Sequence, residues 1–111
     1  MFEGWIRPVR GLKHPVTSRG AYELYAGSAE RDARIRLFGG AEVRSGERAF
    51  VRVTLSRPVV LDVEDSFVLR EAGRRETVAG GRVLDPDPPA KPGPDPAARL
   101  AVQRSSSLTG E

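Results

Sequence analysis

The residues best suited to chemistry are four arginines in one short stretch of the chain. Arg70, Arg74, Arg75 and Arg82 lie in a pattern that predicts two strands joined by a Gly-containing turn. A guanidinium presents a fork of donors that matches phosphate oxygens, and backbone N–H groups freed at a bulge can add to the same contact. The stretch therefore suits a phosphate-binding hairpin. From composition alone, a hairpin whose arginines only keep an edge strand in solvent is the better interpretation.

Three closely spaced carboxylates form a second group of chemical interest. Asp62, Glu64 and Asp65 could hold a divalent cation, and they are the only cluster on which a small free-standing enzyme could be based. Their spacing does not match a calcium-binding loop, so we expect an acidic turn between strands. His14 is the only histidine of the chain, and in a loop before Pro15 we expect an exposed bystander.

The composition of the chain narrows the classes of function. The sequence has no cysteine, which removes disulfides, zinc-thiolate sites and cysteine nucleophiles. It also lacks a Gly-x-x-x-x-Gly-Lys-Ser/Thr loop and a Gly-x-Ser-x-Gly elbow. No apolar run approaches the roughly 20 residues of a membrane-spanning helix, and the net charge of +3 favours a nucleic-acid partner only weakly. We expect a non-catalytic binding domain with no membrane partner and no cofactor of its own.

The pattern of apolar residues predicts short strands with turns between them and no helix before Pro86. The pair Gly80 and Gly81 inside the last strand indicates a bulge, a sharp bend or a close approach of two backbones. The connection over residues 8–20 is expected to be irregular because glycine and proline interrupt it. The expected strands cover residues 2–7, 21–26, 33–37, 50–56, 67–69 and 77–84. This arrangement predicts an all-β antiparallel barrel or sandwich.

The outer faces of two predicted strands carry another set of arginines. Arg34, Arg36 and Arg52 alternate with apolar residues that we expect to point inward. They form a possible second basic surface. The ordinary solvent-exposed side of the strands is the better interpretation.

The composition changes after Asp85. Residues 1–86 are predicted to form the β-barrel domain, and residues 87–96 a proline-rich C-terminal linker. Residues 97–111 are predicted to be the start of a helical segment or a disordered tail. A linker that leads into one short helical segment makes us expect a piece of a larger protein.

Three stretches of the sequence resemble the third, β-barrel domain of the selenocysteine-specific elongation factors, which are relatives of elongation factor Tu. The stretches are Tyr22–Glu30 with Ala33–Leu37, Val51–Val60, and Ser66–Arg70 with Thr77–Pro86. The resemblance departs from the family pattern at Glu64 and Ser66, where the family usually has glycine and arginine. The missing glycine raises the question of whether this turn keeps the family's geometry.

The resemblance implies an antiparallel closed barrel of six or seven strands, of the translation-factor domain III type, in a cytoplasmic protein. It implies a barrel that holds the T-stem side of selenocysteinyl-tRNA and packs on a GTPase domain, which binds GTP and Mg and is absent from this sequence. The parent protein would act on the ribosome in selenocysteine incorporation. Carried onto this chain, the RNA contact falls on Arg70, Glu71, Ala72 and Gly73, and charge adds Arg74 and Arg75.

A protein-interaction barrel is the alternative to the RNA-binding one. Such a barrel would dock on a nucleotide-binding domain without touching RNA. An exposed apolar patch beside Trp5 or Phe38 would favour this interpretation.

Overall fold

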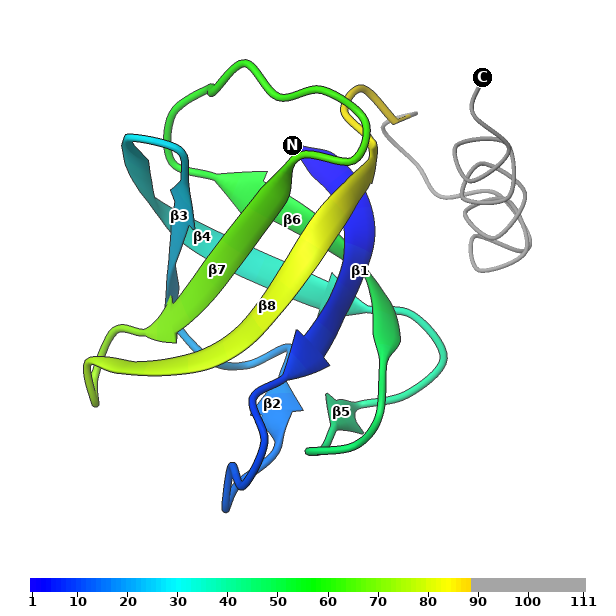
Figure 1. Cartoon of the computed structure of the whole chain (residues 1–111), viewed down its shortest axis with the longest axis vertical. Coiled ribbons are helices and arrows are strands. Elements are labelled where there is room, and N and C mark those ends of the chain that lie inside the picture. The colour runs from blue at the N-terminus through cyan, green and yellow to red at the C-terminus, as the bar shows by residue number, and fades with distance from the viewer. Residues whose placement is uncertain (89–111) are drawn as a thin grey trace.

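Eight strands and no helix make up residues 1–88, which are the part of the chain that the computed structural model describes (Figure 1). Within these residues no helix is long or apolar enough to cross a membrane. The predicted linker lies outside the described residues except for residues 87 and 88, and the predicted tail at 97–111 lies wholly outside them. The strands are β1 (Phe2–Pro8), β2 (Val16–Thr17), β3 (Tyr22–Ala26), β4 (Ala29–Leu37), β5 (Glu42–Val43), β6 (Ala49–Leu55), β7 (Ser66–Glu71) and β8 (Glu76–Asp85).

Six of these strands close into one antiparallel barrel. Their order around the barrel is β1-β6-β4-β3-β7-β8, and β8 pairs with β1 to complete the ring. The predicted all-β closed barrel is therefore confirmed, with six strands. Closure leaves no free edge in the main sheet, which protects a small β domain from pairing with other chains.

The barrel interior follows the predicted alternation of side chains. In β4, Ala33, Ile35 and Leu37 are buried, while the residues between them are exposed. Val53 of β6 is fully buried opposite Ile35. Burial of such side chains stabilises the fold by about 1.5–3 kcal/mol each. The period-two pattern therefore fixes which face of each strand carries the functional side chains.

The connection over residues 8–20 is irregular, as predicted, except for the end of β1 at Pro8 and the short strand β2, which the sequence did not predict. Val16 and Thr17 form β2 and pair with Val43 and Glu42 of β5 in a separate two-stranded sheet. Val16 and Val43 are almost fully buried. Two-residue strands are too short to show a period, and this pair forms because both valines complete the core.

The glycine pair of β8 lies where two backbones approach closely. A methyl group at Gly81 would overlap the carbonyl oxygen of Trp5 and lie 2.7 Å from Cζ of Phe67. The bulges of β8 flank this point: Val78 and Leu84 are the unpaired extra residues in the pairings with β7 and β1. Of the three roles considered for the pair, close approach is the one that the structure shows at Gly81.

Candidate nucleic-acid interface

The turn between β7 and β8 is held at both of its ends. The backbone N–H of Arg75 donates to the carbonyl oxygen of Glu71 at 2.8 Å, and the N–H of Ala72 donates to the carbonyl of Ala21 at 3.0 Å. Arg75 has a φ of 52°, a left-handed conformation in which a non-glycine residue is uncommon. The turn is therefore a defined structure, connected to the segment just before β3.

The arginines predicted to contact phosphate differ in what surrounds them. Arg74 has a side chain that is 58% exposed, and its Nε lies 3.7 Å from Oε1 of Glu71. Arg75 is exposed and Arg70 is half-buried, and no carboxylate within residues 1–88 forms an ion pair with either one. The turn thus presents three guanidinium groups. Only that of Arg74 forms an ion pair within residues 1–88, and its separation of 3.7 Å makes the pair weak.

Arg82 does not belong to this group. Its Nη1 donates to the carbonyl oxygen of Glu64 at 3.1 Å, in the acidic turn before β7. In that turn Oδ2 of Asp65 accepts from the N–H of Asp62 at 2.8 Å. No group of three or more potential metal ligands occurs among the residues that the structure describes. The three carboxylates form the acidic turn that was predicted.

His14 is closer to the turn than the sequence suggested. Its side chain is 26% exposed, and Nε2 lies 3.7 Å from Oε2 of Glu71 and 3.7 Å from Oε2 of Glu76. His14 is therefore half-buried, and the expectation that it is exposed was wrong. Nothing in the sequence places this loop against the ends of β7 and β8, because the contact joins segments more than fifty residues apart.

The second set of arginines is divided by burial. Arg34 and Arg36 are exposed, as predicted, but Arg52 is only 7% exposed. Its Nη2 and Nε donate to Oε2 of Glu3 at 2.7 and 3.0 Å, and Glu3 is fully buried. The expectation that Arg52 lies on a solvated face was wrong, because β1 places Glu3 directly opposite it.

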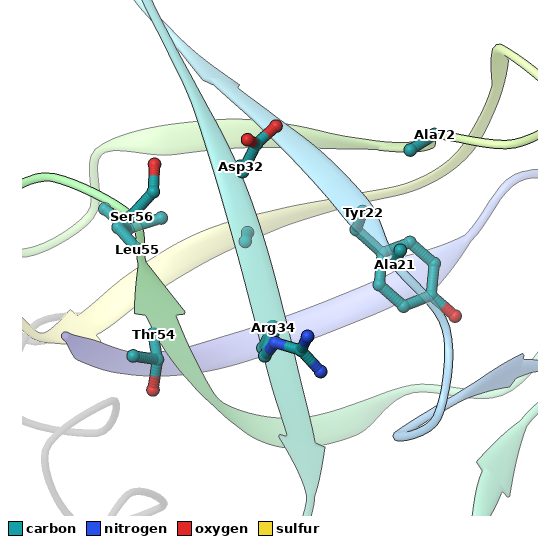
Figure 2. Close-up of a pocket in the computed structure, with 9 residues that line it drawn as sticks. Ala21, Tyr22, Asp32, Arg34, Thr54, Leu55, Ser56 and Ala72 are labelled. Carbon is teal, nitrogen blue, oxygen red and sulfur yellow. The ribbon is translucent and has the colours of Figure 1, made fainter.

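A hollow of about 540 Å³ lies on the outer surface beside the turn (Figure 2). Ala72 of the turn forms part of its wall, so the hollow and the turn are continuous. Arg34 and Asp32 project from β4, and the hydroxyl groups of Thr54 and Ser56 come from the end of β6. The remaining lining residues are Ala21, Tyr22, Ala33 and Leu55.

The most exposed apolar side chains lie at the other end of the barrel. Val60 is 95% exposed and Val63 is 46% exposed, both in the loop between β6 and β7, which lies beside the N-terminus in Figure 1. The turn between β7 and β8 lies at the opposite end of the barrel (Figure 1). Trp5 and Phe38 are only half-buried, and Arg48 lies over the ring of Trp5 at 5.1 Å. The most exposed apolar side chains are therefore not at the positions that the sequence suggested.

A model of a known protein family matches this chain. The model described as "Selenocysteine-specific elongation factor, beta-barrel domain" matches residues 10–90. No curated protein sequence matches the chain. The matched range includes β2 to β8 and the whole of the turn described above.

Proposed function

Because this chain belongs to the β-barrel domain family of the selenocysteine-specific elongation factors, we propose that its barrel binds the selenocysteine tRNA on the T-stem side. The contact surface is the turn between β7 and β8, with Arg70, Glu71, Ala72, Gly73, Arg74 and Arg75. In this proposal the barrel also packs on the GTPase domain of the same factor, which binds GTP and Mg. The complex acts on the ribosome, in the cytoplasm.

The observation that carries the proposal is the exposure of arginines on an anchored turn. Arg74 and Arg75 extend into solvent, while backbone hydrogen bonds to Ala21 and Glu71 hold the turn itself. A held turn loses little conformational entropy on binding, which favours the contact. The base edges of an A-form stem are poorly accessible, so the contact runs through phosphates and 2′-hydroxyls and discriminates little between sequences.

The hollow beside the turn supports the same proposal. Arg34 adds another exposed guanidinium, and the hydroxyls of Thr54 and Ser56 are further hydrogen-bonding groups that suit a sugar–phosphate backbone. Asp32 is the one carboxylate of the hollow, and a carboxylate accepts a hydrogen bond from a 2′-hydroxyl. Together the turn and the hollow make a surface longer than the turn alone.

Substitution of the turn arginines tests the proposal. Arg74→Ala and Arg75→Ala should each weaken binding of selenocysteine tRNA about fivefold, since a charge-assisted contact in solvent is worth roughly 1 kcal/mol. Each should also lower the slope of log affinity against log salt by about 1, because one phosphate contact is lost. Fluorescence anisotropy with labelled tRNA, from about 50 to 200 mM salt, measures both quantities.

Arg44→Ala is the matched control. Arg44 is 61% exposed, so it resembles Arg74 in exposure, but it pairs closely with Glu42 at 2.8 Å and lies beside the small β2–β5 sheet. It should leave the affinity and the salt slope close to those of the unchanged chain. Unchanged affinity and slope in both turn variants would contradict the proposed site.

A protein-interaction barrel remains the second candidate, and the exposed Val60 and Val63 favour it. Apolar side chains gathered at one end of a small domain suit contact with another domain. Beside them Met1, Pro58, Val59 and Leu61 help to line a hollow of about 210 Å³. If the salt titration shows no effect of the turn arginines, docking of this end on the GTPase domain becomes the leading function.

A further inference from the structure

Two glutamates at the base of the β7–β8 turn place negative charge beside the arginines of the proposed contact surface. Glu71 ends β7, Glu76 begins β8, and the two residues are direct partners in the strand pairing. Like charges that face each other on paired strands repel, and both carboxylates also repel RNA phosphates. A positive group between them would offset both effects.

His14 lies in the position that such a group would take. Its Nε2 is 3.7 Å from one carboxylate oxygen of each glutamate, and its Nδ1 is 3.4 Å from the carbonyl oxygen of Pro15. Within residues 1–88, Nε2 is buried without a hydrogen-bond partner. All these neighbouring groups are acceptors, and only the protonated ring carries a donor on both nitrogens. Both ring nitrogens therefore face acceptors.

Glu71 connects His14 to the arginines of the turn. Its Oε2 faces His14, and its Oε1 lies 3.7 Å from Nε of Arg74, so one carboxylate is shared between the two side chains. The charged groups around His14 are Glu71 of β7, Glu76 of β8, Arg74 beyond Glu71, and the exposed Lys13 beside it in its own loop. The guanidinium that shares Glu71 with His14 is therefore one of those proposed to contact phosphate.

We propose that His14 is a positioning residue of the RNA-binding turn, and that its protonation strengthens RNA binding by pairing with Glu71 and Glu76. The inference rests on the proposed function. Histidine is the side chain whose charge normally changes between about pH 5 and 8, and this chain has only one. The affinity for RNA therefore rises as the pH falls, and His14 accounts for the increase.

The test uses the full 111-residue chain and labelled selenocysteine tRNA at about pH 5.5 and 7.5. The unchanged chain should bind about threefold more tightly at the lower pH, the effect expected of one solvent-screened charge. His14→Gln should bind weakly at both pH values. His14→Lys, which is charged throughout, should bind tightly at both. Lys13→Gln removes a charge from the same loop and should keep the pH dependence.

Two results would overturn the inference. One is a pH dependence that survives in His14→Gln, and the other is a His14→Lys chain no tighter than His14→Gln at about pH 7.5. Both leave the proposed function standing, because the tRNA still binds. Failure of the unchanged chain to bind at either pH refutes the proposed function and the inference with it. Circular dichroism of each variant checks that the barrel is folded.

Discussion

Replacing Gly81 by alanine should destabilise the barrel at the place where β1 and β8 close it. The new methyl group would overlap the carbonyl oxygen of Trp5, which belongs to the backbone of β1. It would also lie 2.7 Å from Cζ and 3.1 Å from Cε1 of Phe67. Neither neighbour can move away easily, because Phe67 is 2% exposed and packs edge-on against Phe2 at 5.2 Å. The two strands must separate to make room.

The loss of stability follows from the core packing and the backbone hydrogen bonds that this separation disrupts. Overpacking in a closed core costs typically 1–3 kcal/mol, and each weakened backbone hydrogen bond of the β1–β8 pair adds about 1 kcal/mol. We therefore expect Gly81→Ala to lower the free energy of unfolding by about 3 kcal/mol, out of a total of roughly 5–15 kcal/mol for a small domain.

Gly80→Ala is the matched control on the same strand. The nearest atom to its added methyl group would be the carbonyl oxygen of Phe67 at 3.9 Å, an ordinary contact. Gly80 has no positive φ, so alanine should be neutral or stabilising by up to about 1 kcal/mol. Urea unfolding followed by circular dichroism should show a midpoint about 2 M lower for Gly81→Ala only. Equal midpoints for the two variants would refute this account of barrel closure.

Two further substitutions test the strained turn and the buried ion pair. Glu64→Gly should raise the free energy of unfolding by about 0.5–1 kcal/mol. Glu64 has a φ of 72° and a buried Oε1 with no hydrogen-bond partner within residues 1–88, and glycine removes both costs. A loss of stability in thermal unfolding would contradict this prediction. Arg52→Ala should lower the free energy of unfolding by about 3 kcal/mol, because it removes the guanidinium that pairs with the fully buried Glu3. Arg36→Ala is the control, since Arg36 is the exposed strand partner of Arg52 on β4, and it should change the free energy of unfolding by less than about 0.5 kcal/mol. Equal urea midpoints for these two arginine variants would show that the ion pair contributes little.

The sequence predicted the barrel because its main strands have a clear period of two. In β4 the alternation of Ala33, Ile35 and Leu37 with exposed arginines identified the inner face correctly. Glu64, which stands where the resembled family usually has glycine, adopts the left-handed conformation that glycine takes most easily.

What the sequence could not predict depends on contacts between distant segments. The pairing of Glu3 with Arg52 joins residues 49 positions apart, and only the register of β1 against β6 brings them together. His14 meets Glu71 and Glu76 for the same kind of reason. Long-range ionic contacts leave no local pattern in the chain, so the charge environment of the turn became visible only in the fold.

The most direct test of the RNA-binding proposal is a titration of the isotope-labelled chain with selenocysteine tRNA, followed through its backbone amide signals. We expect saturable, salt-sensitive changes at residues 70–76, which include the anchored turn, and in Arg34 beside it. The β6–β7 loop around Val60, at the other end of the barrel, should stay unchanged. Changes confined to that loop, or no change at residues 70–76, would contradict the proposal.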